Sequence, residues 1–127
     1  MFCLLDTNVL IEALAANSPN DVSKRIEATL IDNARYSVVT RMELLGWSGH
    51  TAESRQSAQV LLEQLVEVGL TPATVDKVID IRSRIVIKLP DAIIAASAIT
   101  ENLQLMTRNT KDFNRVSGLQ LVDPFVG

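Results

Sequence analysis

The stretch LLDTNVLI, at residues 4–11, decides the fold that this sequence predicts. Its five apolar residues are typical of a buried strand that runs directly into a buried helix. Asp6, Thr7 and Asn8 interrupt these residues at the junction. Burying an unpaired carboxylate is expensive, so Asp6 either caps the helix or binds a ligand.

The composition is that of one packed domain. Of the 127 residues, 47% are hydrophobic and 21% are charged, which is typical of a globular protein and argues against disorder. We therefore expect a single domain over residues 1–127. Only 4% of the residues are aromatic, which argues against nucleic-acid recognition by base stacking.

The cysteine content and the length of the apolar runs indicate in which cellular compartment the protein is expected. Cys3 is the single cysteine, so we expect a small buried hydrophobe in a reducing environment rather than half of a disulfide. No apolar run reaches the length of about 18 residues needed to span a membrane, and no signal segment opens the sequence. We expect a cytoplasmic protein without a membrane partner.

Short apolar runs alternate with helical patterns along the chain. The expected strands lie at residues 2–5, 36–39, 66–70, 103–107 and 119–122. The expected helices lie at 9–16, about 20–33, from 40 onward, 53–65, 72–86 and from 90 onward. This alternation predicts a three-layer α/β/α domain with a mainly parallel sheet of four or five strands.

Four acidic residues are expected at the carboxyl edge of this sheet, where ligand sites of open α/β folds form. Asp6 directly follows the first strand, and Glu43 lies about one helical turn beyond the second. Asp112 lies in the loop after the fourth strand. Asp91 opens the helix before that strand, so it reaches this edge only if the preceding segment has already crossed the sheet.

Each of these acids also has a purely structural explanation. Asp6 can cap a helix, and Glu43 can close a capping box over the residues TRME, 40–43. Asp91 suits the first turn of a helix, and Asp112 can brace a turn. Taken singly, these explanations are about as good as a ligand role. Taken together, they require all four acids to meet at one edge of the sheet by accident.

Converging carboxylates point to a metal ion, because they repel one another unless a cation neutralises them. Oxygen ligands favour Mg²⁺, with Mn²⁺ able to substitute, and one cysteine with one histidine, His50, cannot build a structural zinc site. The shortage of histidine also removes the commonest general base. Activation of water beside a phosphodiester would then fall to the metal. We expect one ion and leave a second open.

The net charge of −3, from 15 acidic and 12 basic residues, differs from the basic surface usual in nucleic-acid binders. Setting the four site acids aside leaves 11 acidic residues, which nearly balance the 12 basic ones. Some basic residues flank the acids in sequence and could hold phosphate groups, or they are solvated surface charges. The candidates are Arg41, Arg108 and Lys111, followed by Lys88 and Arg115.

Together these residues resemble the PIN-domain ribonucleases, and specifically the VapC-type toxins of toxin–antitoxin pairs. Four motifs in order carry the resemblance over nearly the whole chain. They are LLDTNVLI with Asp6, SVVTRMELLG with Glu43, LPDAIIAASAI with Asp91, and LQLMTRNTKDF near the end.

The resemblance implies a Rossmann-like sheet with a Mg²⁺-dependent endoribonuclease site. Asp6 and Asp91 would be the principal catalytic metal ligands, and Glu43 would complete the set. Asn8 and Thr107 would position the acids or a bound water.

The resemblance leaves the fourth ligand position open. Many relatives carry an acid where this chain has Asn109. Either Asp112 takes over that role, or Asn109 coordinates through its own oxygen. The resemblance also implies a homodimer, an RNA substrate and a cognate antitoxin, whose arginine could enter the acidic site and block it.

Two other classes of function remain open. A signalling receiver domain needs paired acids after the first strand, whereas this chain has Asp-Thr-Asn there, and the run VEVGL ends without an acid. The alternative to an enzyme is a non-catalytic PIN-like module that binds RNA or a protein. Such a module would show metal-enhanced RNA binding without cleavage.

Overall fold

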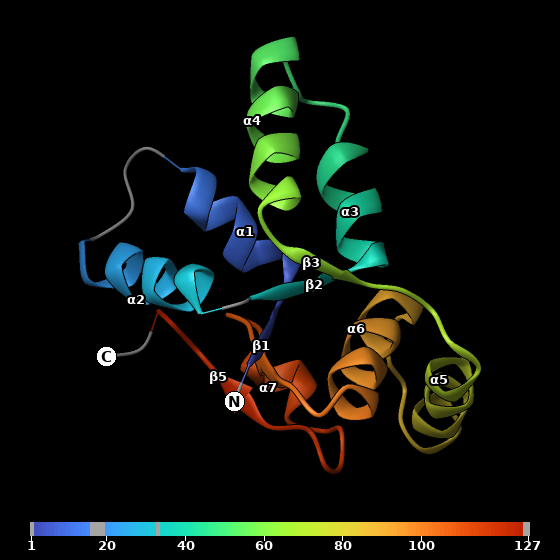
Figure 1. The fold of residues 1–127 in the computed structure, drawn as a ribbon. Helices are drawn as coiled ribbons and strands as arrows, with labels where there is room; N and C mark the ends of the chain where they lie inside the picture. Colours follow the sequence, from blue (N-terminus) through green and yellow to red (C-terminus); the bar gives the residue numbers. More distant parts are fainter. Residues whose placement is uncertain (1, 16–19, 33, 126–127) are drawn as a thin grey trace.

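The computed structural model describes residues 2–15, 20–32 and 34–125. These residues form a five-stranded parallel sheet in the order β3-β2-β1-β4-β5 (Figure 1). The strands are β1 (Cys3–Leu5), β2 (Arg35–Ser37), β3 (Val66–Val68), β4 (Gln104–Met106) and β5 (Leu121–Val122). The helices are α1 (Thr7–Leu14), α2 (Asn20–Ile31), α3 (Val38–Leu45), α4 (Ala52–Glu63), α5 (Pro72–Arg84), α6 (Leu89–Thr100) and α7 (Thr110–Phe113).

Helices cover both faces of the sheet, which confirms the predicted α/β/α layers. Side chains alternate along β1 as a strand requires, so Leu4 and Leu5 enter different core clusters. Leu4 packs with residues of α5, α6 and α7, and Leu5 packs with residues of α1, α2 and α4. Figure 1 shows these two groups of helices on opposite sides of the strands.

The strand order places a topological switch point between β1 and β4. The chain passes from β1 to β2 and β3 on one side, and then returns across the sheet to β4 on the other side of β1. Leu5 pairs with Met106 at the ends of these two strands. Connections leave this point in opposite directions, which opens the edge where ligands bind in folds of this kind.

The boundary between β2 and α3 differs from the prediction. The strand ends at Ser37 and the helix begins at Val38, whereas the sequence pattern predicts a strand over 36–39. Ser37 is the N-cap, and its Oγ accepts a hydrogen bond from the backbone N–H of Val39 at 3.2 Å. Val38 and Val39 are β-branched, which imitates a strand composition. The capping box at 40–43, considered as the structural explanation of Glu43, does not form, because Thr40 lies inside the helix and is fully buried.

The apolar pattern over 72–86 predicts one face that contains Val75, Val78 and Ile79, but helix α5 buries a different stripe. Thr74, Val78 and Ile81 are buried, whereas Val75 and Ile79 are 45% and 62% exposed. The polar Thr74 can enter the core because its hydroxyl lies within hydrogen-bonding distance of the Thr71 and Thr100 hydroxyls. The apolar pattern over 72–86 therefore marks two faces, one packed on α6 and one open.

Three further sequence predictions can be compared with the fold. Helix α2 ends at Ile31, and residue 33, the predicted end, lies outside the described residues. Cys3 is half-buried, and burial raises the pKa of its thiol. Within the described ranges, no helix is long and apolar enough to cross a membrane.

Candidate functional site

Asp6 lies where β1 ends and α1 begins, and it is only 6% exposed. Its backbone is extended, and its Oδ1 accepts a hydrogen bond from the backbone N–H of Thr7 at 2.8 Å. Asp6 is therefore the N-cap of α1. This bond occupies one carboxylate oxygen and leaves the other facing the carboxyl edge of the sheet.

Two side chains from neighbouring segments hold the second oxygen of Asp6. The Thr107 hydroxyl donates to Oδ2 at 2.7 Å, and the Asn8 amide donates to the same atom at 3.1 Å. Thr107 directly follows β4 and is fully buried, and Asn8 accepts in turn from the backbone N–H of Arg108 at 3.1 Å. Asn8 and Thr107 thus meet at the β1–β4 switch point and fix the orientation of Asp6.

Glu43 reaches the same edge from α3 and is joined to α1 through Thr7. The Thr7 hydroxyl donates to Glu43 Oε1 at 2.8 Å and lies 3.2 Å from the Thr40 hydroxyl. The sequence interpretation assigned no role to Thr7 and considered Thr40 only as part of a capping box. The sequence did offer one indication of this role, because Thr7 is a polar residue between Asp6 and Asn8 at the start of a largely apolar helix.

Asp91 lies in the first turn of α6 and is half-buried. Burial raises its pKa, and the nearby charges of Glu43 and Asp112 raise it further, while Lys88 lowers it. The pKa of Asp6 is also raised, by burial first and then by the charges of Asp91 and Glu43, against the lowering effect of its hydrogen bonds. Because the charge of Asp91 acts on Asp6, the segment before α6 brings Asp91 to the edge that carries Asp6.

Asn109 and Asp112 form one hydrogen-bonded unit at the start of α7. The Asn109 backbone N–H donates to the Thr107 hydroxyl at 2.9 Å, and the Asn109 side-chain amide donates to Asp112 Oδ2 at 3.1 Å. Thr107 therefore connects this unit to Asp6. Asp112 is exposed, and its charge reaches Asp91, so both candidates for the fourth position lie beside the other acids.

The donor set fits a divalent cation such as Mg²⁺ or Mn²⁺. Burial first, and the charges of other carboxylates after it, raise the pKa values of Asp6 and Asp91, and a cation would remove the repulsion between these charges. The available donors are carboxylate oxygens, which hard cations prefer. Among the residues that the structure describes, however, no three histidine, cysteine or acidic side chains already form a group that could hold an ion. Binding would therefore require the acidic side chains to move closer together.

The predicted phosphate-binding residues have different surroundings. Arg41 forms two hydrogen bonds with the Glu67 carboxylate of β3, and its side chain is 51% exposed. The Arg108 guanidinium lies 3.8 Å from the centre of the Phe125 ring. Lys88 and Lys111 are exposed. The charge of Lys88 lowers the pKa of Asp91, so Lys88 lies near this acid.

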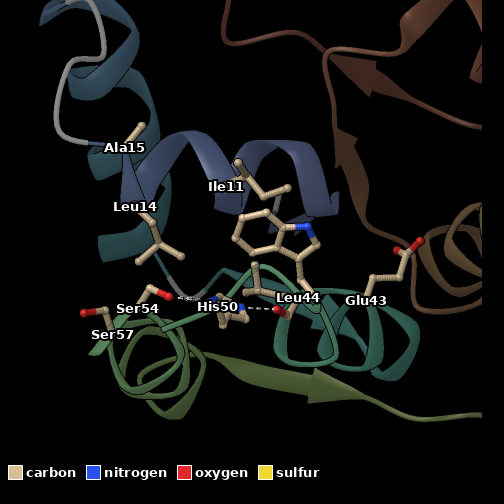
Figure 2. Close-up of a pocket in the computed structure, with 9 residues that line it drawn as sticks. Ile11, Leu14, Ala15, Glu43, Leu44, His50, Ser54 and Ser57 are labelled. Atoms are coloured by element: carbon tan, nitrogen blue, oxygen red, sulfur yellow. Dashed lines mark hydrogen bonds between the residues drawn. The ribbon is translucent and has the colours of Figure 1, made fainter. Parts of the chain in front are cut away.

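A groove of about 600 Å³ begins beside Glu43 and runs between α1 and the α3–α4 pair. Figure 2 shows Ile11 and Leu14 on the α1 side, Leu44 and His50 on the other side, and Glu43 at one end. Ile11 and Trp47, which also lines the groove, are 55% and 59% exposed. The sequence interpretation did not predict this groove, because a helical apolar pattern does not distinguish core from open surface.

His50 joins α3 to the start of α4 inside the groove. Its Nε2 donates to the Leu44 carbonyl oxygen at 2.7 Å, so in the neutral ring Nδ1 accepts from the Ser54 hydroxyl at 2.8 Å. His50 thus supports the groove wall, and its ring nitrogens are engaged away from the carboxylates.

Comparisons with known proteins agree with this geometry. The PIN domain family model matches residues 3–119. A protein named Ribonuclease VapC from Rickettsia bellii is 43% identical over 61 residues, which are 46% of this chain and 46% of that protein. The chain thus matches about half the length of this curated relative.

Two solved structures share the fold over almost the whole chain. One is VapBC2 from Rickettsia felis bound to a DNA fragment from their promoter, with a TM-score of 0.83, 26% identity, and coverage of 97% of this chain and 98% of that one. The other is VapBC-1 from nontypeable Haemophilus influenzae, with a TM-score of 0.80, 27% identity and 98% coverage of both chains.

Proposed function

The chain belongs to the PIN domain family, and on this premise we propose that it is a Mg²⁺-dependent endoribonuclease and the toxin of a toxin–antitoxin pair. The observation that carries the proposal is the buried Asp6 carboxylate, held on both oxygens and surrounded by the charges of Glu43 and Asp91. The Ribonuclease VapC relative supports the activity, and the VapBC structures support the toxin role.

Asp6, Asp91 and Glu43 would hold the ion, with Asp112 or Asn109 as the fourth contributor. When bound, Mg²⁺ lowers the pKa of water and stabilises the charge on the leaving oxygen of a phosphodiester. The chain's own contribution is orientation. Thr107 and Asn8 keep Asp6 Oδ2 fixed. The RNA substrate would place this function in the cytoplasm.

The decisive experiment is cleavage mapping on total RNA with Mg²⁺, comparing the unchanged chain with Asp91→Asn. We expect cleavage by the unchanged chain and none by the variant, with identical circular dichroism spectra. Asp32→Asn is the matched control, because Asp32 is exposed in the turn after α2 and should cleave normally. Equal cleavage by Asp91→Asn would refute the site. Metal-enhanced RNA binding without cleavage by any form would identify a non-catalytic module instead.

An antitoxin is proposed as the partner that covers the groove beside Glu43. Ile11, Leu14 and Trp47 present apolar surface there, and the groove leads to the carboxylates, where a partner arginine could form a bidentate pair. Trp47 is the single tryptophan, so its fluorescence should change when the antitoxin binds. A bound antitoxin that leaves the fluorescence, the Mg²⁺ affinity and the cleavage rate unchanged would contradict this assignment.

A homodimer is proposed through the open face of α5. Val75 and Ile79 are exposed on this helix, and they line a groove that Leu70 and Leu89 also border. Sedimentation should show a dimer that Ile79→Glu dissociates, whereas Val60→Glu, at an exposed position on α4, should leave it intact. A monomeric unchanged chain would refute the proposal.

A further inference from the structure

We propose that a basic pocket between α5 and residues 115–117 is a second phosphate subsite, which holds the RNA backbone at a distance from the carboxylates. This inference rests on the proposed ribonuclease function and adds a binding site to it. The pocket has a volume of about 470 Å³. The charged residues among the eight that line it are Lys77, Asp80, Arg84 and Arg115.

The pocket carries three cations against one anion. Asp80 accepts from Arg84 Nε at 3.0 Å and from Lys77 Nζ at 3.5 Å. A single carboxylate cannot neutralise both cations, but it does hold their side chains on the same wall. The Arg84 side chain is 73% exposed and pairs with Asp80 through Nε, so its terminal nitrogens can donate to a phosphate.

Arg115 supplies the third cation, and its position is fixed by the backbone. Its Nη1 donates to the Val86 carbonyl oxygen at 2.7 Å, and its Nε donates to the Asp112 carbonyl oxygen at 3.2 Å. Both of these acceptors are neutral, so they orient the guanidinium without cancelling its charge. A preorganised guanidinium is the group that recognises phosphate oxygens best.

The pocket and the carboxylates are connected through the same short segments. Asp112 provides a carbonyl oxygen to Arg115, and the charge of its own side chain acts on Asp91. The Val86 carbonyl oxygen accepts from Arg115. Lys88, two residues further on, lowers the pKa of Asp91 through its charge. In Figure 1, α5 lies beside α6, at whose start Asp91 stands. A strand of RNA that passes from the acids over α7 would therefore meet the pocket.

The lining favours a phosphodiester over a free nucleotide. None of the eight lining residues has an aromatic ring, so the pocket offers no surface on which a base could stack. Contacts between basic side chains and phosphate groups bind the RNA backbone without recognising the base sequence. The pocket would therefore strengthen the binding of long RNA and contribute nothing to the choice of the cleaved base.

The test compares Lys77→Gln/Arg84→Gln with Lys24→Gln/Arg55→Gln, which removes the same charge from α2 and α4. Binding of a labelled single-stranded RNA of about 20 nucleotides is measured by fluorescence anisotropy in EDTA, where no cleavage is expected. We expect the pocket variant to bind about tenfold more weakly, with a salt slope smaller by about 1.4, since each phosphate contact to a single strand contributes about 0.7. The control should bind like the unchanged chain.

Two further measurements separate the possible outcomes. With Mg²⁺, the pocket variant should raise KM for the long RNA and leave kcat unchanged. Equal binding by the pocket variant and the control would overturn the inference, as would displacement of the RNA by a mononucleotide at equal phosphate concentration. If the unchanged chain binds RNA through the pocket but never cleaves it, the ribonuclease proposal fails while the subsite stands.

Discussion

Replacing Thr107 with valine should destabilise the metal-free protein by about 2–3 kcal/mol at neutral pH. Thr107 is fully buried, and its hydroxyl donates to the charged Asp6 Oδ2 at 2.7 Å, a bond of the class that contributes about 1.5–3 kcal/mol. The same hydroxyl accepts from the Asn109 backbone N–H at 2.9 Å, and losing that acceptor costs about 1 kcal/mol more. Valine adds a buried methyl group, which offsets about 0.8 kcal/mol.

Thermal unfolding followed by circular dichroism measures this change. For a domain of 127 residues the expected loss corresponds to a Tm about 10 °C lower. The loss should also depend on pH. Because Thr107 lowers the pKa of Asp6, the valine variant has an even higher Asp6 pKa, so its deficit grows as pH rises through that pKa and shrinks in acid.

Thr107→Ser is the matched control, because it keeps the hydroxyl and removes only a methyl group. It should retain most of the hydrogen-bond contribution and show no added pH dependence. A valine variant whose Tm lies within 2 °C of the unchanged chain, or whose deficit is the same at pH 4.5 and pH 7.5, would show that Thr107 does not hold Asp6 as described.

Three further predictions concern the carboxylates. Mg²⁺ at ten times its Kd should stabilise the fold by about 1.4 kcal/mol, or about 5 °C in Tm, and Asp91→Asn should abolish this shift in a thermal melt. Without metal, Asp91→Asn should unfold at a higher temperature than the unchanged chain at pH 7. The raised pKa of Asp91 means that its charge destabilises the fold, and the advantage should vanish as pH falls through that pKa; a pH series of melts checks the sign. Asn109→Asp should raise Mg²⁺ affinity in calorimetry if position 109 contributes a ligand, and should leave it unchanged if Asp112 alone does.

The fold was predictable where local signals and packing agree. The alternation of apolar runs with helical patterns indicates parallel strands, and the polar interruption after residue 5 marks the end of β1 correctly. The error at 36–39 arose because Val38 and Val39 have strand propensity, whereas the Ser37 cap starts the helix two residues earlier. A cap depends on one hydrogen bond, which a propensity average does not register.

The contacts that support the site were less accessible from the sequence. Thr7 and Thr40 are 33 residues apart in the sequence, and their hydroxyls meet only because α3 packs beside α1. The open face of α5 was missed for a related reason. Val75 and Ile79 fit the helical apolar pattern as well as Val78 does, and only the position of α6 decides which of them is buried.

The two explanations of Asp6, cap and ligand, prove to be compatible because they use different atoms. Oδ1 accepts from the Thr7 backbone N–H, which stabilises the start of α1, while Oδ2 is held by groups that arrive across the β1–β4 switch point. A cap alone would need neither Thr107 nor Asn8, and it would suffer from the nearby charge of Asp91. Burial raises the pKa of Asp6, and the charges of Asp91 and Glu43 raise it further. A carboxylate placed only to cap a helix gains nothing from such neighbours, so the arrangement argues for a function beyond capping.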